Sequence, residues 1–300
     1  MTTLERYGFG GERRTAAGDP PEGESFGRVV SAHGDYFHLV ADVAEGEILA
    51  RKKTSAFRDV SPARSIKGGK TSKGAAAVNA VQPTTGDFVR FAYNPSGESR
   101  IFGVLPRFAV FERVDPSSSG RRAQTIAVNF DTLFFLMSAN ENFSEARLVR
   151  ALELADASGC RDRMAALITK SDLADDAQMS AWMRQIAGCG IPVLAVSAKT
   201  GAGMDALAPY AAAGRTLALV GSSGVGKSSL VNALAGEEWM ATQEIQSWNG
   251  KGRHTTTSRE LVMLPSGLMV IDTPGMRELG LLGRDGTHRF HSSGTHRYRK

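Results

Sequence analysis

The tract Gly221-Ser-Ser-Gly-Val-Gly-Lys-Ser-Ser constrains the fold more than any other stretch of this 300-residue chain. It fits the pattern G-x-x-x-x-G-K-[ST], in which a glycine-rich loop points backbone N–H groups at a phosphate. The apolar run 216–220 before it predicts a buried strand, and 229–235 after it predicts a helix, which is the context that the motif requires. A surface loop rich in Gly and Ser is the alternative, and the flanking strand and helix disfavour it.

The motif predicts a bound nucleoside triphosphate. Lys227 is expected to reach the terminal phosphates, and the Ser228 hydroxyl is expected to hold Mg²⁺. The residues expected to surround the phosphates are Gly221, Ser222, Ser223, Gly224, Val225, Gly226, Lys227, Ser228 and Ser229.

Length and composition allow roughly two soluble globular domains, with 42% hydrophobic and 22% charged residues. No apolar run approaches the ~18–20 residues of a membrane span, and no signal peptide opens the chain, so we expect a cytoplasmic protein without a membrane partner. The two cysteines, Cys160 and Cys189, form no CxxC pair and are expected to be reduced structural thiols.

Five short strand candidates at 27–32, 36–41, 47–50, 87–93 and 100–105 predict an OB-type β-barrel over residues 24–115. We expect residues 109–120 to close this barrel and to end in a polar linker, and residues 1–23 to be disordered. The segment 54–86 is rich in Lys, Ser and Gly and is expected to be a mobile loop. It carries most of a basic excess of eight Lys and Arg against one acid between residues 51 and 73.

The basic loop and the barrel favour nucleic-acid binding, but a solvated loop without a partner stays open as an alternative. Five aromatic residues are candidates for stacking on bases, and strand alternation turns about half of such residues into the core. They are Tyr36, Phe37, Phe88, Phe91 and Tyr93.

After residue 116 the pattern changes to alternating strands and helices. Strands are expected at 124–129, 131–137, 164–168 and 192–196, and helices at 144–158, 175–187 and 204–213. This alternation predicts a doubly wound α/β domain over residues 116–283, with a nucleotide at the carboxyl ends of its strands.

Two strand ends carry residues suited to a guanine base. Asp172 can accept hydrogen bonds from N1–H and the exocyclic amine of guanine, which adenine does not offer on that edge. The Lys170 stem can cover one face of the base. The tract Ser197-Ala198-Lys199 follows the next strand and offers a backbone N–H to guanine O6. Thr169 directly precedes Lys170 in the chain and belongs to the same group of candidate nucleotide-binding residues.

The phosphate elements come after the base elements, which reverses the order of most GTPases. Beyond the phosphate loop, Asp272 ends an apolar strand and suits a water-mediated contact with Mg²⁺, while the Gly275 N–H can sense the γ-phosphate. A parallel sheet tolerates the reversed order, because positions in space survive when old termini are joined and new ones are cut at the surface.

In this order the chain resembles the ribosome small-subunit-dependent GTPases (RsgA/YjeQ type), which are circularly permuted. The resemblance runs from about residue 25 to about residue 283 and rests on seven tracts, at 105–107, 127–131, 169–172, 197–199, 221–229, 252–257 and 272–275. It implies an OB domain that contacts ribosomal RNA, a central GTPase domain and a C-terminal zinc domain.

The resemblance also implies a catalytic residue. Met276 stands where many GTPases carry a glutamine, and in this family a histidine of the switch loop, here His254, is thought to orient the attacking water. An exposed histidine without this role is the alternative. One of Thr255, Thr256 and Thr257 is expected to bind Mg²⁺, with Thr256 taken as the candidate.

The chain departs from the family at two places. Thr169 stands where most relatives have Asn, and a hydroxyl makes fewer hydrogen bonds than an amide, so weaker guanine binding is expected. No cysteine follows Cys189, and residues 284–300 read as a basic tail in place of the zinc domain. We therefore predict no structural zinc.

The sequence thus predicts a monomeric Mg²⁺-dependent GTP hydrolase. By resemblance it acts late in maturation of the small ribosomal subunit, binds rRNA through the barrel and is released when GTP is hydrolysed. The alternative is a GTP-dependent RNA-binding assembly placeholder with little hydrolysis. An ATPase is a third reading, to be separated by comparing GDP with ADP binding.

Overall fold

The computed structural model describes residues 1–56, 81–114, 123–140, 143–236 and 259–272. Its first unit is a closed barrel in which β3 and β5 are parallel and every other neighbouring pair is antiparallel. The barrel closes because β4 pairs with β1, which gives the order β1-β2-β3-β5-β4. Its strands are β1 (Ser25–His33), β2 (Tyr36–Val40), β3 (Ile48–Lys52), β4 (Phe88–Ala92) and β5 (Ser99–Val104). All five strand candidates are confirmed, and a short 3-10 turn, η1 (Thr54–Ala56), follows β3.

The first 23 residues differ from the expectation of disorder. They hold two short helices, α1 (Thr3–Arg6) and α2 (Glu12–Ala17). Thr2 caps α1 through a capping box with Glu5. Leu4 and Phe9 are buried against barrel aromatics, so apolar contacts offset the entropy of ordering this segment. Its glycines and charges suggested disorder, and the two apolar side chains that anchor it carry little weight in composition.

Residues 109–114 do not close the barrel. They form β6 (Val110–Val114), which pairs with β7 (Ala123–Val128) in a separate two-stranded sheet. The barrel has no edge left for β6, since β4 and β1 already close it. Phe111 on β6 and Ile126 on β7 are buried in the core of the α/β unit instead. The expected boundary at 115/116 lies outside the described residues.

The α/β unit is built on five parallel strands and one antiparallel strand, in the order β10-β9-β8-β11-β13-β12. The strands are β8 (Thr132–Ser138), β9 (Met164–Thr169), β10 (Val193–Ala195), β11 (Thr216–Gly221), β12 (Glu260–Met263) and β13 (Met269–Asp272). The strand that leads into the phosphate loop, β11, therefore lies in the middle. Earlier strands lie on one side of it and later strands on the other, which is the arrangement that a permuted chain requires.

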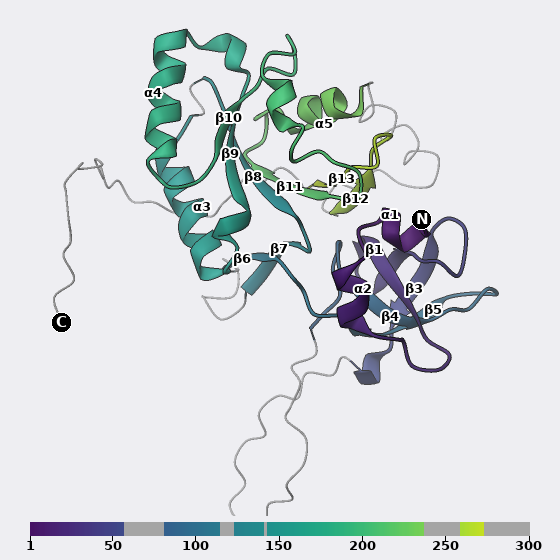
Figure 1. The fold of residues 1–300 in the computed structure, drawn as a ribbon. Coiled ribbons are helices and arrows are strands. Elements are labelled where there is room, and N and C mark those ends of the chain that lie inside the picture. Colours follow the sequence, from purple (N-terminus) through teal and green to yellow (C-terminus); the bar gives the residue numbers. More distant parts are fainter. Residues whose placement is uncertain (57–80, 115–122, 141–142, 237–258, 273–300) are drawn as a thin grey trace, which may run out of the picture.

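Helices cover both faces of this sheet, as Figure 1 shows. One face packs against α3 (Glu145–Ala157) and α4 (Asp176–Ala187), and the other against α5 (Lys227–Ala235). Alternate residues of β8 follow the two layers, because Phe135 joins the first core and Phe134 the second. The helix expected at 204–213 is reduced to the 3-10 turn η5 (Met204–Leu207); two further 3-10 turns are η3 (Arg161–Arg163) and η4 (Ser171–Leu173).

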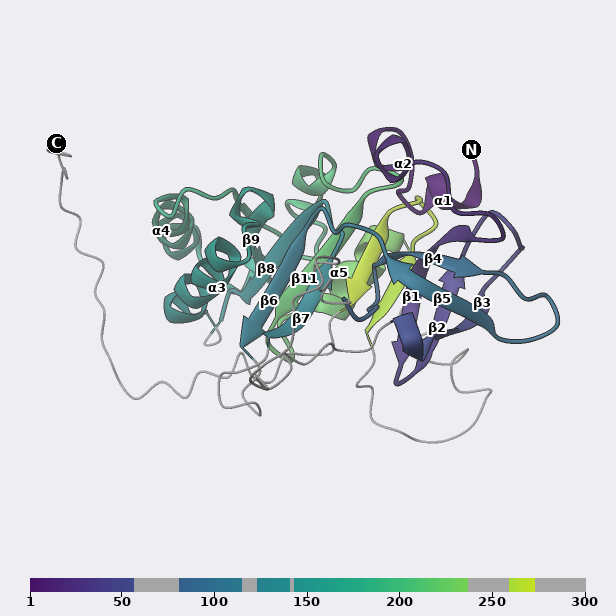
Figure 2. The same cartoon turned by 90° about the horizontal axis from the view of Figure 1, so that it is seen from below.

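The sequence did not predict β12, which joins the two units. This strand pairs antiparallel with β13 on one side and meets β1 of the barrel on the other, where Ser31 faces Glu260. Figure 2 shows β12 and β13 between β11 and the barrel. Val30 of β1 and Ile271 of β13 belong to one buried cluster at this boundary. The barrel and the α/β unit thus share a continuous sheet and an apolar contact.

A buried arginine crosses the same boundary. Arg28 on β1 is fully buried, and its guanidinium donates to the carbonyls of Tyr7, at 2.6 Å, and Asn129, at 3.0 Å. Burial lowers the pKa of Arg28 to about 9. Among the described residues no carboxylate forms an ion pair with this buried charge, so its contacts with carbonyls are needed to offset the cost of burial. These contacts join the N-terminal segment, the barrel and the α/β unit.

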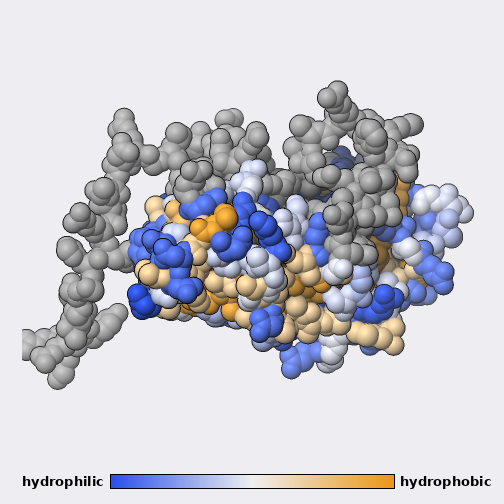
Figure 3. Space-filling view, turned by 90° about the horizontal axis from the view of Figure 1, so that it is seen from above, coloured by the Kyte–Doolittle hydropathy of each residue, from blue (hydrophilic) through white to orange (hydrophobic). Residues whose placement is uncertain are grey.

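The described surface in Figure 3 mixes hydrophilic and hydrophobic residues, with the strongest orange confined to small groups. Exposed large apolar residues are few and include Tyr36, Leu49 and Tyr93 on the barrel. Among the described helices, none has the length and apolarity to span a bilayer.

Candidate guanine nucleotide site

The phosphate loop runs from the end of β11 to the start of α5, so the strand, loop and helix predicted around it are confirmed. Gly224 and Gly226 have φ values of 74° and 101°, in the left-handed region that favours glycine. A Cβ on Gly221 would lie 3.0 Å from the Leu136 carbonyl oxygen, so glycine allows a close approach of β11 and β8 that a side chain would crowd. The backbone of the loop therefore favours glycine at all three positions.

Lys227, the first residue of α5, turns back over its own loop. Its Nζ donates to the carbonyl of Gly221 at 3.1 Å and to that of Ser222 at 3.3 Å. The exposed Ser228 and Ser229 stand in the first turn of the same helix. A helix N-terminus with an ammonium group above it favours anions, so this corner suits a polyphosphate.

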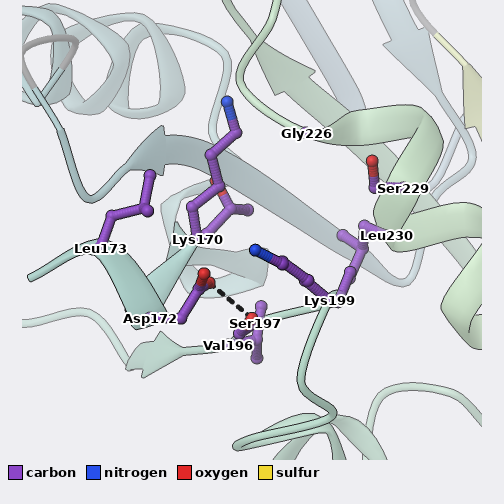
Figure 4. Close-up of a pocket in the computed structure, with 11 residues that line it drawn as sticks. Lys170, Asp172, Leu173, Val196, Ser197, Lys199, Gly226, Ser229 and Leu230 are labelled. Atoms are coloured by element: carbon purple, nitrogen blue, oxygen red, sulfur yellow. Dashed lines mark hydrogen bonds between the residues drawn. The ribbon is translucent and has the colours of Figure 1, made fainter.

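A pocket of about 340 Å³ opens beside the phosphate loop. It brings together all the base-site candidates from two strand ends with residues of the phosphate loop and α5. Its lining residues are Thr169, Lys170, Asp172, Leu173, Val196, Ser197, Ala198, Lys199, Gly226, Ser229 and Leu230. Figure 4 shows Asp172 and Ser197 turned toward each other, with Ser229 and Leu230 on the opposite side.

Ser197 fixes the Asp172 carboxylate. Its buried hydroxyl donates to Asp172 Oδ1 at 2.6 Å and accepts from the backbone N–H of Thr200 at 3.2 Å. The hydrogen bond from Ser197 is the main cause that lowers the pKa of Asp172, and the lysines on either side act in the same direction. The carboxylate is therefore ionised at neutral pH and can only accept hydrogen bonds, as recognition of a guanine edge requires.

Two side chains tie this pocket to the phosphate loop. Lys170 has a φ of 54°, and its Nζ donates to the Gly224 carbonyl at 2.8 Å. The Thr169 hydroxyl lies within hydrogen-bond reach of the Val225 carbonyl and 3.2 Å from the Met137 carbonyl. Thr169 thus reaches the phosphate loop although it lacks the amide of Asn. Its expected effect on guanine affinity stays a prediction.

Sequence reasoning missed the apolar part of the pocket, which consists of Leu173, Val196 and Leu230. Each of them is close in sequence to a polar motif. Leu173 follows Asp172 directly and is 59% exposed, which is unusual for a leucine and fits the edge of a site for a flat ring. The sequence signal that could have indicated Leu173 was its position outside the apolar runs of the predicted strands.

The predicted Mg²⁺ ligands fall partly within the described residues. Asp272 ends β13, where it is in register with Leu219 of β11, so it stands beside the strand that leads to the phosphate loop and Ser228. The predictions for His254, Thr255, Thr256 and Gly275 lie outside the described residues. No cluster of three or more His, Cys, Asp or Glu suited to a metal occurs in the part of the chain that the structure covers.

A P-loop beside a base pocket whose elements come earlier in the chain defines a circularly permuted GTPase domain. The RsgA GTPase family matches residues 104–282, and this chain belongs to that family. The "Small ribosomal subunit biogenesis GTPase RsgA 2" of Lactiplantibacillus plantarum is 36% identical over 270 residues, which cover 89% of this chain and 70% of the relative.

Two solved structures share the fold at 23% identity. The match to YjeQ from Thermotoga maritima has a TM-score of 0.57 and covers 84% of this chain and 75% of the YjeQ chain. The match to YloQ, described as a circularly permuted GTPase, has a TM-score of 0.51 and covers 88% of this chain and 76% of the YloQ chain. The predicted architecture of a barrel followed by a permuted GTPase is thereby confirmed.

Proposed function

We propose that this GTPase hydrolyses GTP during biogenesis of the small ribosomal subunit, in the cytoplasm and as a monomer. The observation that carries the proposal is the pocket in which Asp172, held by Ser197, lies beside the phosphate loop. The relatives' shared description as small-subunit biogenesis GTPases supplies the process. Binding of rRNA by the barrel and release on hydrolysis are parts of the same proposal.

The residues of this chain divide the work between base and phosphates. Asp172 accepts from the guanine edge, and the Lys170 stem covers one face of the ring. Lys227 exchanges its two loop carbonyls for phosphate oxygens and stabilises charge that develops there. Mg²⁺ held by Ser228 and Thr256, with Asp272 acting through water, would neutralise phosphate charge. His254 orients the attacking water.

Two exposed aromatic rings of the barrel support the RNA part of the proposal. Of the five aromatic candidates, Phe37, Phe88 and Phe91 are buried in the core, whereas Tyr36 and Tyr93 are exposed. Exposed aromatic rings are the ones available to stack on bases.

Basic groups on and just after β3 lie beside aromatic rings of the neighbouring strands β2 and β5. The Arg51 guanidinium lies 4.8 Å from the Tyr36 ring centre, and Lys53 Nζ lies 4.7 Å from that of Phe102. Paired cations and rings of this kind suit a single-stranded nucleic acid. Most of the basic loop that we predicted lies outside the described residues.

GTP turnover with and without purified small subunits tests the main proposal. We expect slow intrinsic hydrolysis that small subunits stimulate, because phosphoryl transfer depends on groups whose placement a partner can complete. His254→Ala should lower turnover and keep GDP affinity. If neither small subunits nor this substitution change the rate of GTP turnover, the protein is instead an assembly placeholder.

The proposed RNA contact at Arg51 and Tyr36 has its own test, with a matched control. Arg51→Gln should weaken binding to small subunits, whereas Arg150→Gln removes an exposed arginine from α3 in the other unit and should not. Equal effects of the two substitutions would exclude Arg51 and Tyr36 as the RNA contact.

The prediction that the chain holds no structural zinc concerns residues outside the described part. Elemental analysis after dialysis against a chelator tests it, and a stoichiometric zinc would contradict it.

A further inference from the structure

A short turn of the barrel touches the α/β unit at several points. We call residues 84–87 the joint turn. On the barrel side the Gly86 N–H donates to the Val29 carbonyl at 2.9 Å, and the Val29 N–H donates to the Asp87 carbonyl at 2.8 Å. Arg107 donates to both carboxylate oxygens of Asp87, each at 2.8 Å. The joint turn is therefore fixed to the barrel.

Its other side meets the α/β unit. The Thr85 hydroxyl is almost fully buried and donates to the Arg259 carbonyl at 2.9 Å. The Gly86 carbonyl accepts from Asn129 Nδ2 at 3.1 Å. A Cβ on Gly86 would lie 2.8 Å from the Val128 carbonyl oxygen and 3.2 Å from Ile271 Cδ1, and φ is 95° there. The joint turn thus inserts among three segments of the α/β unit, and Gly86 lies where there is no room for a side chain.

Two of those segments adjoin the parts of the chain that are expected to sense the nucleotide. Arg259 comes two residues after the tract 252–257, and Ile271 comes directly before Asp272. Strand β12 begins directly after Arg259, and β13 carries Ile271. Both strands rest on the barrel as well, because Ser31 faces Glu260, and Val30 shares a buried cluster with Ile271. Both approaches to the nucleotide are therefore anchored on the barrel.

We propose that the joint turn couples the barrel to the nucleotide site, with Thr85 and Gly86 as positioning residues for GTP hydrolysis. A partner that shifts the barrel shifts β12 and β13 with it, because the contacts are direct and closely packed. Coupling between two binding sites is reciprocal. Bound GTP must therefore alter the affinity of the barrel for RNA by the same factor by which bound RNA alters the affinity for GTP. This inference rests on the proposed function for the identity of the RNA partner only.

Thr85→Val tests the coupling because it removes the hydroxyl and keeps the shape. Thr85→Ser keeps the hydroxyl, and Thr84→Val makes the same change one residue away, where the backbone N–H donates to Asp87 Oδ2 and is kept in the variant. The full-length protein is titrated with small subunits in the presence of GDP and of a non-hydrolysable GTP analogue. The ratio of the two affinities measures the coupling.

We expect Thr85→Val to reduce this ratio by about 2–10-fold, the range of one hydrogen bond, with GDP affinity unchanged. Thr85→Ser and Thr84→Val should keep the ratio of the parent. A purely structural threonine would lower the melting temperature and leave the ratio intact, and that result would overturn the inference.

Hydrogen exchange gives a readout that needs no ribosome. In the parent protein, addition of the GTP analogue should change exchange of the Gly86 and Val29 amides, and Thr85→Val should reduce that change. If these amides ignore the nucleotide in the parent, the coupling is refuted whatever the partner. If they respond but small subunits bind in neither nucleotide state, the proposed partner is wrong and the coupling stands.

Discussion

Thr169→Val removes one hydroxyl from the junction of the base pocket and the phosphate loop. Thr169 is 4% exposed and Val225 is 1% exposed, so water cannot replace the lost donor. The substitution leaves the Val225 and Met137 carbonyls without the hydroxyl that now lies beside them. Valine has the same shape, so the change isolates the hydrogen bond from packing.

The size of the effect follows from burial. A buried acceptor that loses its donor costs about 1–3 kcal/mol, and the added methyl group recovers part of this, so the free energy of unfolding should fall by about 1–2 kcal/mol. The same bond holds the phosphate loop against β9. If about 1 kcal/mol of it is lost from the binding-competent loop, the Kd for GDP should rise about fivefold.

Thr216→Val is the matched control. Thr216 is also fully buried, on the strand that leads to the phosphate loop, but its hydroxyl has no hydrogen-bond partner among the described residues. Removing that hydroxyl should be neutral or stabilising, because an unpaired polar atom leaves the interior. Urea denaturation measures stability, and calorimetric titration measures GDP affinity. Equal losses for the two valine variants would refute the reasoning.

Three further predictions concern the pocket and the core. Asp172→Asn should weaken GDP binding at least about 10-fold and favour xanthosine diphosphate, because an amide offers a donor to a carbonyl at position 2 of the base; calorimetry with both nucleotides checks this. A Cβ on Gly203 would lie 2.1 Å from the Ala195 carbonyl oxygen, whereas Gly201 has a similar positive φ and open space, so Gly203→Ala should cost about 1–3 kcal/mol more than Gly201→Ala in urea denaturation. Burial raises the pKa of Cys160 to about 11, so at pH 8 only about one Cys160 thiol in a thousand is ionised. Alkylation should therefore label the less buried Cys189 first, and the rate of labelling at Cys160 should increase as the pH rises.

The sequence predicted the parts of the site whose signals are local. The phosphate loop needs glycines at fixed spacing between a strand and a helix, and Asp172 and Ser197 follow two apolar strands. Parallel strands end at the same edge of a sheet, so their chain order alone brings such residues together. The bond from Ser197 to Asp172 is a result of that shared edge.

Contacts between units left weaker signals. Arg28 stands among strand residues where an exposed arginine is the usual case, yet it is fully buried because Tyr7 and Asn129 bring carbonyls to it from distant parts of the chain. The expected disorder of residues 1–23 and the expected barrel role of 109–114 failed for the same reason. In each case the decisive partner lies on another unit.

The antiparallel strand β12 occupies the edge of the permuted domain that meets the barrel. In the sheet, β12 lies at the far side of β13 from the phosphate-loop strand, and its free edge meets β1 of the barrel. An unpaired edge in the permuted domain would expose backbone groups that the barrel now covers. Because β12 begins directly after Arg259, the cover also places Thr85 on the carbonyl next to that strand. The same contact that protects the sheet edge therefore brings the barrel to the approach of the nucleotide site.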